Sequence, residues 1–186
     1  GFIVGGEVNL EGENLLNKSD KEMQSVRGSR IAMVLQDPMT ALNPVFKISD
    51  QVGETLNIHK KLKGSQLKNA IIDMLKKVNI PAPEERMKDY PHQLSGGMRQ
   101  RVVGAIGVSC SPTILIADEP TTSLDATIQA QYLRLLKDLQ NEFGMAILFI
   151  THDFGIVAKM CDRVAVMYAG RIVEIGEVRE IFNNPK

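Results

Sequence analysis

Two short stretches decide the fold, and the first is Leu94-Ser95-Gly96-Gly97-Met98-Arg99-Gln100-Arg101. Ser95 can cap a helix that begins here, and the two glycines let a phosphate approach the N–H groups at the positive end of that helix. The second stretch is Ile114-Leu115-Ile116-Ala117-Asp118-Glu119-Pro120, which predicts a buried strand that ends in two carboxylates. Out of context, each has an ordinary explanation: a capped turn, or a strand followed by an acidic turn.

Two further polar residues follow predicted strands. Gln36 comes after the apolar run at 31–35, and His152 follows the strand predicted over 145–150. In α/β folds, ligands bind at the carboxyl ends of the strands. An amide there can ligate Mg²⁺ or a water, and an imidazole can donate a hydrogen bond to a phosphate oxygen. Without the other motifs, either residue would be taken for a solvated loop residue.

The order of the predicted elements indicates an α/β fold. Strands are predicted over 7–11, 31–35, 114–117, 145–150, 163–168 and 171–175. Helices are predicted from Ser19 and over 66–80, 98–108, 126–143 and 153–160. Alternating strands and helices predict a mostly parallel sheet covered on both faces, and the continuous apolar run at 31–35 suggests burial on both sides. The segment from about 44 to 101 is helical in character.

Composition limits the classes of function. The chain has 186 residues, 44% of them apolar and 24% charged, with zero net charge. It therefore offers no basic track for nucleic acid. No apolar run approaches the roughly 20 residues of a membrane span. Cys110 and Cys161 are far apart in apolar surroundings, which predicts buried, reduced thiols.

Together and in this order, the motifs resemble those of the ATP-binding-cassette (ABC) ATPases. Leu94–Gly97 resembles the signature motif, and the stretch ending at Glu119 resembles Walker B. Thr121-Thr122-Ser123-Leu124-Asp125 resembles the D-loop, Gln36 the Q-loop glutamine and His152 the switch histidine. Residues 36–44 and 90–101 are similar to those of importers for oligopeptides, dipeptides or nickel. Met98 stands where the family often has Gln.

The resemblance implies a partial ABC-ATPase core of the P-loop NTPase type. Residues 1–45 and 106–186 would be pieces of that core, and 46–105 an inserted helical subdomain. The parent protein would bind ATP with Mg²⁺ and couple its hydrolysis to the import of peptides or nickel.

The resemblance also implies roles for single residues. Glu119 would be the general base, and Asp118 would hold Mg²⁺. Gln36 would also ligate Mg²⁺ and, with His152, sense the γ-phosphate. The remaining residues would act across a dimer: Ser95, Gly96 and Gly97 on the ATP of a partner subunit, and Asp125 at the dimer seam.

The partners implied are a second ABC ATPase subunit, identical or different, and transmembrane permease subunits. An extracytoplasmic solute-binding protein would be an indirect partner, and no nucleic acid is expected. The protein would lie at the cytoplasmic face of the cell membrane. The choice of solute would rest with the permease and the binding protein.

The sequence lacks the Walker A P-loop of the family, and also the aromatic residue that stacks on adenine. Such a loop needs Gly-x-x-x-x-Gly-Lys-Ser/Thr, and the nearest match is residues 12–19. There Asn17 replaces the second glycine, and Leu15 and Leu16 would place apolar side chains in a phosphate cradle. The resemblance therefore implies a P-loop before Gly1. We expect a fragment that does not hydrolyse ATP alone, exposes apolar surface, and is marginally stable or self-associates.

Two other classes of function stay open. The chain could be a non-catalytic module that docks on a permease through its helical part. A chromosome-maintenance or DNA-repair ABC ATPase would carry a long coiled coil between Gln36 and Leu94. Only about 58 residues lie there, without heptads.

Overall fold

The computed structural model describes residues 3–36, 38–122 and 124–185, without the side chains of Pro38 and Met39. The predicted motif positions Asp37 and Ser123 lie outside the described residues. The strands are β1 (Asn9–Leu10), β2 (Glu13–Asn14), β3 (Ile31–Val34), β4 (Ile114–Asp118), β5 (Ala146–Ile150), β6 (Arg163–Tyr168) and β7 (Arg171–Glu177). The longer helices are α3 (Ile48–Lys60), α4 (Gly64–Lys77), α6 (Gly96–Val108) and α7 (Ala126–Phe143). The shorter ones are α1 (Asp20–Val26), α2 (Pro38–Ala41), α5 (Pro83–Arg86), α8 (Phe154–Met160), α9 (Val178–Asn183) and two 3-10 turns, Leu15–Asn17 and Pro91–Gln93.

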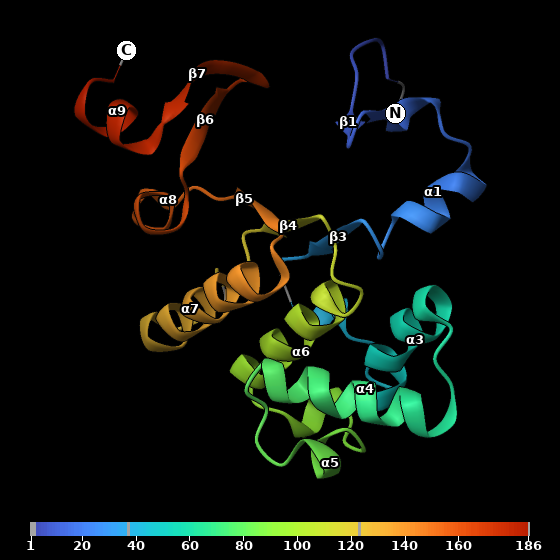
Figure 1. The fold of residues 1–186 in the computed structure, drawn as a ribbon. Helices are drawn as coiled ribbons and strands as arrows, with labels where there is room; N and C mark the ends of the chain where they lie inside the picture. Colours follow the sequence, from blue (N-terminus) through green and yellow to red (C-terminus); the bar gives the residue numbers. More distant parts are fainter. Residues whose placement is uncertain (1–2, 37, 123, 186) are drawn as a thin grey trace.

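The centre of the molecule is a parallel sheet of three strands in the order β3-β4-β5. Figure 1 shows it with the helices α3 to α7 on one side and two separate hairpins on the other. The hairpins are antiparallel pairs, β1 with β2 and β6 with β7. The predicted α/β class and its parallel sheet are confirmed.

Helices α6 and α7 cover one face of the parallel sheet. Side chains alternate across a strand, and Val34, Leu115 and Ala117 are fully buried on this face. Gly107 of α6 lies so close that an added Cβ would come within 3.2 Å of Leu115 and Val34. The same core continues into α3 and α4, where Val52 and Leu75 are fully buried.

The opposite face of the sheet is open, and here the prediction of cover on both faces is wrong. Met33, Ile116 and Leu148 form one row across the three strands. Met33 is 46% exposed and Leu148 54% exposed. The apolar run at 31–35 is therefore buried on one side only. A groove of about 810 Å³ between β5, α8 and β6 adds further apolar surface. The predicted exposure of apolar surface is confirmed.

Local signals set most element boundaries as expected. Ser19 and Glu22 form the predicted capping box of α1, and Gly144 ends α7 in the left-handed conformation. Ala169 and Gly170 both have positive φ and make the tight turn between β6 and β7. The first strand is shorter than predicted, because Glu11 already has φ of 50° and begins the turn into β2.

Residues 12–19 do not form a phosphate cradle, as predicted. They run through β2 and a 3-10 turn to the start of α1. Leu15 points into a small core with Leu10 and Val26, and the Asn14 side chain caps the turn. The backbone N–H groups therefore do not converge on a ligand.

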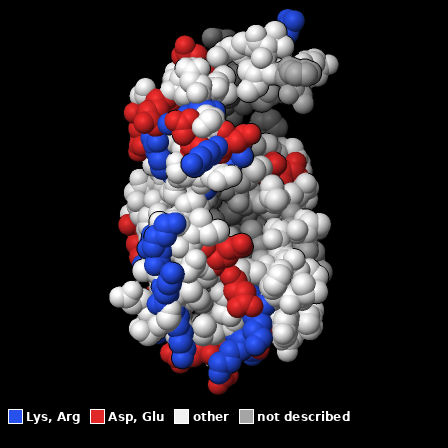
Figure 2. All heavy atoms as spheres, turned by 90° about the vertical axis from the view of Figure 1, so that its right-hand side faces the viewer, with Lys and Arg blue, Asp and Glu red and all other residues white. Residues whose placement is uncertain are grey.

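The surface and the cysteines carry few further signals. On the face in Figure 2, basic and acidic side chains lie interspersed, which agrees with the zero net charge. No helix among the described residues is long and apolar enough to cross a membrane.

Cys110 and Cys161 are free but only partly buried, so the prediction that both thiols are buried is wrong in degree. Burial still raises the pKa of both thiols.

We expect the open sheet face to drive self-association of this chain. Replacing Leu148 and Ile150 together by Thr should raise the dissociation constant at least about tenfold, because burying one such side chain contributes about 1.5–3 kcal/mol. Sedimentation at several concentrations measures this. Ile58→Gln on α3 is the control, since Ile58 is 51% exposed but lies off the sheet. An equal effect of both variants, or a monomeric wild-type chain, would contradict the expectation.

Candidate functional site

The site is built on the turn that follows β4. Asp118 ends the strand, and Glu119 has φ of 43°, a left-handed conformation that is unfavourable for a residue with a side chain. The Glu119 N–H donates to the carbonyl of Ile150 at 2.8 Å, which ties the turn to the end of β5. The turn thus holds the two carboxylates at the carboxyl edge of the parallel sheet.

Three side chains converge on the Glu119 carboxylate. Oε2 accepts hydrogen bonds from Gln36 Nε2 at 2.9 Å and from Thr122 Oγ1 at 3.0 Å. Oε1 lies 3.0 Å from Nδ1 of His152. Gln36 follows β3, Glu119 follows β4 and His152 follows β5. Polar side chains that follow three neighbouring strands therefore meet around this one carboxylate.

These contacts stabilise the ionised form of Glu119. Its pKa is lowered, chiefly by the hydrogen bond with His152 and next by the one from Thr122. Partial burial opposes the shift. The side chain is 27% exposed, so water reaches it. At neutral pH Glu119 is therefore a carboxylate that can accept a hydrogen bond from water.

The contact also sets the tautomer of His152. An ionised carboxylate only accepts hydrogen bonds, so Nδ1 carries the hydrogen that faces Glu119. Nε2 of the neutral ring is then an acceptor. It donates to a phosphate oxygen only when the ring takes up a second proton, and the ring is open to solvent with its side chain 75% exposed.

Asp118 and Gln36 fit the donor set of a magnesium site. Mg²⁺ is usually held by one or two protein oxygens together with phosphates and waters. Because Gln36 uses Nε2 to bind Glu119, its Oε1 is left as an acceptor. No cluster of three or more His, Cys, Asp or Glu that could hold a metal exists among the described residues. The set therefore suits Mg²⁺ delivered with a nucleotide better than an all-protein cage.

Ser95, Gly96 and Gly97 form the start of α6, away from the Glu119 carboxylate contacts. Ser95 caps the helix by accepting a hydrogen bond from the N–H of Met98. The first N–H groups of a helix have no intrahelical acceptor, and here they belong to the two glycines. A Cβ added at Gly96 would meet nothing within 4 Å. The helix start is therefore open at Gly96, whereas Gly97 is partly covered by Ile128.

The sequence model of the family described as ABC transporter matches residues 3–122. The chain belongs to this family. It is 53% identical over its whole length to the oligopeptide transport ATP-binding protein OppD of Bacillus subtilis, covering 52% of that protein. It is 51% identical to the dipeptide transport ATP-binding protein DppD of the same organism, over 99% of this chain and 55% of the relative. The chain thus spans about half the length of the curated relatives it matches.

Solved structures of ABC cassettes share the fold. A dimeric cassette in a post-hydrolysis state, bound to ADP and Pi, superposes with a TM-score of 0.81 at 26% identity, over 95% of this chain and 75% of that one. CbiO1 of Clostridium perfringens, part of the ABC transporter complex cbiONQ, gives 0.82 at 29% identity, over 97% and 69% of the two chains.

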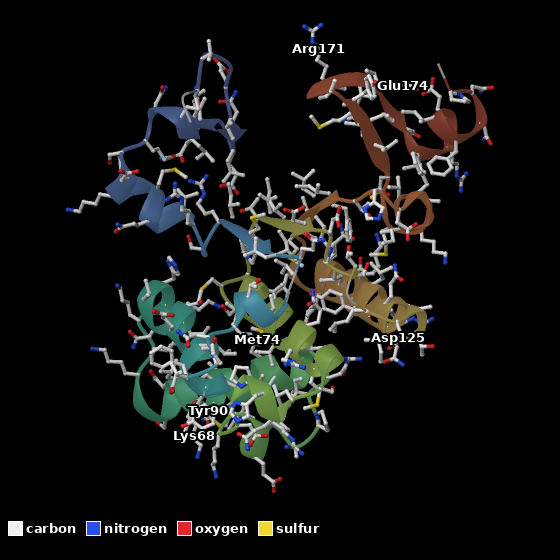
Figure 3. All side chains as sticks on the ribbon, turned by 180° about the vertical axis from the view of Figure 1, so that it is seen from behind. Lys68, Met74, Tyr90, Asp125, Arg171 and Glu174 are labelled. Carbon is white, nitrogen blue, oxygen red and sulfur yellow. The ribbon has the colours of Figure 1, made fainter. Side chains whose placement is uncertain are left out.

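Asp125 has a structural task in the cassette that the sequence did not indicate. Its Oδ1 accepts hydrogen bonds from the N–H groups of Thr127 and Ile128, both at 3.0 Å, and so caps α7. Figure 3 shows Asp125 at the N-terminal end of α7. Asp125 is exposed and therefore accessible to a second subunit. Its contact across a dimer stays a prediction.

Sequence reasoning gave no role to two residues of the site. Thr122 binds Glu119 directly, and Gln100 donates from Nε2 to the carbonyl of Pro120 at 2.7 Å. For Thr122, the available signal was its position three residues after Glu119. Gln100 is fully buried, and a glutamine in the polar run 98–101 carries no signal of burial.

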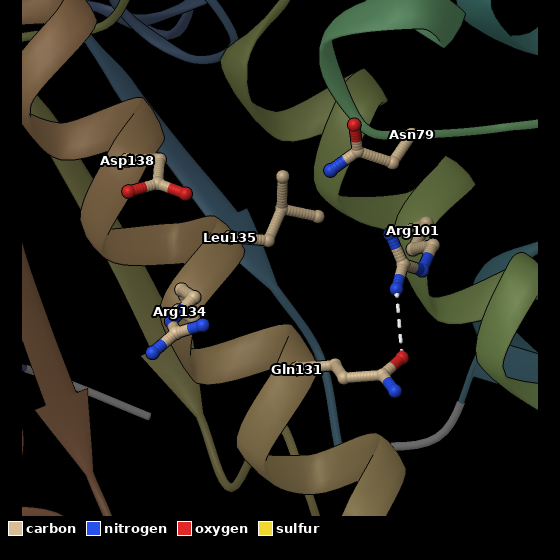
Figure 4. Close-up of a pocket in the computed structure, with 6 residues that line it drawn as sticks. All are labelled: Asn79, Arg101, Gln131, Arg134, Leu135 and Asp138. Carbon is tan, nitrogen blue, oxygen red and sulfur yellow. Dashed lines mark hydrogen bonds between the residues drawn. The ribbon is translucent and has the colours of Figure 1, made fainter.

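A second pocket, of about 290 Å³, lies between the end of α4, α6 and α7 (Figure 4). Arg101 crosses it, donating to the carbonyl of Val78 and to Gln131 Oε1, each at 3.2 Å. Its guanidinium thus joins three helices. Arg134 and Asp138 also line this pocket, and we assign no ligand to it.

Replacing His152 should raise the pKa of Glu119. In His152→Ala the largest cause of the lowered pKa is gone while Thr122 remains, so the pKa should move part of the way to the ordinary value of about 4.3. The carboxylate would then take up its proton at a higher pH. A ¹³C NMR titration of the carboxyl group measures this. His92→Ala, which removes a histidine stacked on Tyr90, is the control. An unchanged titration in His152→Ala would contradict the assignment.

Proposed function

We propose that this chain is the catalytic part of an ATP-binding subunit that drives the import of peptides. The observation that carries the proposal is the convergence of Gln36, Thr122 and His152 on the ionised Glu119 carboxylate, next to Asp118. The relatives named for oligopeptide and dipeptide transport support peptides as the class of solute, and nickel is the alternative.

In this proposal Glu119 accepts a hydrogen bond from the attacking water and orients it toward the γ-phosphate. Gln36 and Thr122 hold one carboxylate oxygen and so fix the direction of the other. His152, when doubly protonated, donates from Nε2 to a γ-phosphate oxygen. Asp118 and Gln36 Oε1 would hold Mg²⁺, and the ion would supply positive charge to neutralise the phosphates.

The start of α6 serves the nucleotide of a second subunit. Ser95, Gly96 and Gly97 present a hydroxyl and free N–H groups to solvent rather than to Glu119, which suits binding in trans. Asp125 would lie near the same seam. The structural relative solved as a dimer supports two cassettes as the working unit, with identical or different subunits.

The remaining partners follow from the import function. The cassette pair would act on transmembrane permease subunits at the cytoplasmic face of the membrane, and a solute-binding protein would deliver the peptide outside. Residues 46–105 would move as a helical subdomain against the core pieces 1–45 and 106–186. The joint packing of α3, α4 and α6 supports that division.

Glu119→Gln tests the catalytic role. In the natural full-length protein, with a paired cassette, it should lower kcat for ATP hydrolysis about 100- to 10,000-fold, because an amide cannot act as a base. ATP binding, measured by equilibrium dialysis, should stay within a few-fold. Glu84→Gln on α5 is the control, since Glu84 lies in an exposed helix turn. A wild-type kcat for ATP hydrolysis in Glu119→Gln would contradict the proposed mechanism.

A second pair of variants tests the phosphate role of the α6 start. Gly96→Asp places a carboxylate beside the free N–H groups, and Gly96→Asn places a neutral side chain of the same shape there. Both fit sterically, because a Cβ at Gly96 meets nothing within 4 Å. The aspartate should weaken ATP-dependent cassette pairing at least about tenfold more than the asparagine, since like charges repel. Equal effects in light-scattering titrations would contradict phosphate binding at this helix start.

A further inference from the structure

Gln100 is a fully buried polar side chain in the first two turns of α6. Its Nε2 donates to the carbonyl oxygen of Pro120 at 2.7 Å, the residue that follows Glu119. A buried amide is retained at little cost only where it is hydrogen-bonded. Gln100 therefore makes a specific link between α6 and the turn after β4.

The linked turn is conformationally strained. Glu119 sits at φ of 43°, and such a backbone persists only where the surroundings determine it. On one side the Glu119 N–H is bound by the carbonyl of Ile150. On the other side Pro120 has no N–H, so its carbonyl is its one backbone hydrogen-bonding group. The Gln100 amide binds that group, and the turn is held from both ends.

We propose that Gln100 is a positioning residue that holds the turn at Pro120 and thereby places the Glu119 carboxylate. The inference rests on the proposed role of Glu119 as the base. Gln100 lies one helical turn after Gly97, on the same helix as the phosphate-binding start. A shift of α6 when Ser95, Gly96 and Gly97 bind a nucleotide would therefore reach Glu119 through this hydrogen bond.

Tyr132 of α7 provides a matched control in the same buried region. Its hydroxyl and Gln100 Oε1 are both buried without a hydrogen-bond partner among the described residues. Burial raises the pKa of Tyr132 far above its ordinary value, and the Gln100 amide beside it acts in the opposite direction. Tyr132→Phe removes a buried polar atom next to Gln100 and leaves the bond to Pro120 intact.

The kinetic test uses the natural full-length protein with a paired cassette. Gln100→Met keeps the side-chain length but has no donor. It should lower kcat about 10- to 100-fold through misplacement of the base, with KM for ATP changed less than about twofold. Tyr132→Phe should match the wild type. In a Glu119→Gln background, Gln100→Met should lower the residual rate less than about twofold. If Gln100→Met lowered the residual rate of Glu119→Gln as strongly as it lowers the wild-type rate, the proposal would be overturned. A wild-type kcat in Gln100→Met alone would overturn it as well.

A structural test on the 186-residue chain is independent of ATP hydrolysis. Exchange of the Glu119 amide hydrogen should speed up at least about tenfold in Gln100→Met and stay unchanged in Tyr132→Phe. In the wild type, the Gln100 side-chain amide hydrogens should exchange slowly, so the test stands even if Gln100→Met does not fold. Fast exchange of those hydrogens, or an unchanged Glu119 amide, would overturn the proposal. An inactive wild type with slow exchange would refute the proposed function alone and leave the link to Pro120 standing.

Discussion

The close approach of α6 to its neighbours is the constraint on which the rest of the structure depends. A Cβ added at Gly107 would lie 3.2 Å from side-chain atoms of Leu115 and Val34 in the sheet. On the side of α7, a Cβ at Gly97 would lie 3.0 Å from Ile128, and one at Gly104 would lie 3.1 Å from the Tyr132 hydroxyl. A larger residue at these places would require its neighbours to shift by a few tenths of an ångström, because interiors are close-packed. In this structure α6 therefore packs closely against both the sheet and α7.

The proposed phosphate donors and the contact to the Glu119 turn both lie on α6. At its start, α6 offers Ser95 and two free N–H groups to solvent, and one turn later Gln100 reaches the turn that carries Glu119. A packed helix moves as a body rather than bending between these points. The same packing contacts of α6 therefore position both the N–H donors at its start and the turn that carries the Glu119 carboxylate. A hydrogen bond thus connects this predominantly polar stretch to the turn that carries Glu119.

Sequence reasoning succeeded where the determining interactions are local. The bounds of α7 and β6, the cap at Ser95 and the strand-end positions of Gln36, Glu119 and His152 all follow from periodicity, caps and parallel topology. It failed where contacts with a distant segment of the chain determine burial or backbone conformation. Exposed apolar surface was predicted, but the apolar run at 31–35 does not indicate which of its faces is covered, so burial on both sides was predicted wrongly. The left-handed Glu119 and the buried Gln100 are imposed by tertiary contacts against the preference of the residue types.

The hydrogen-bonding capacity of the Glu119 carboxylate is only partly used. A carboxylate offers about four lone-pair sites on its two oxygens. Gln36 and Thr122 occupy two on Oε2, and His152 occupies one on Oε1. The remaining site lies on Oε1, the oxygen that faces the solvent-exposed histidine rather than the amide and hydroxyl. A water bound there would lie beside the His152 ring, so the three existing contacts limit where a fourth can form.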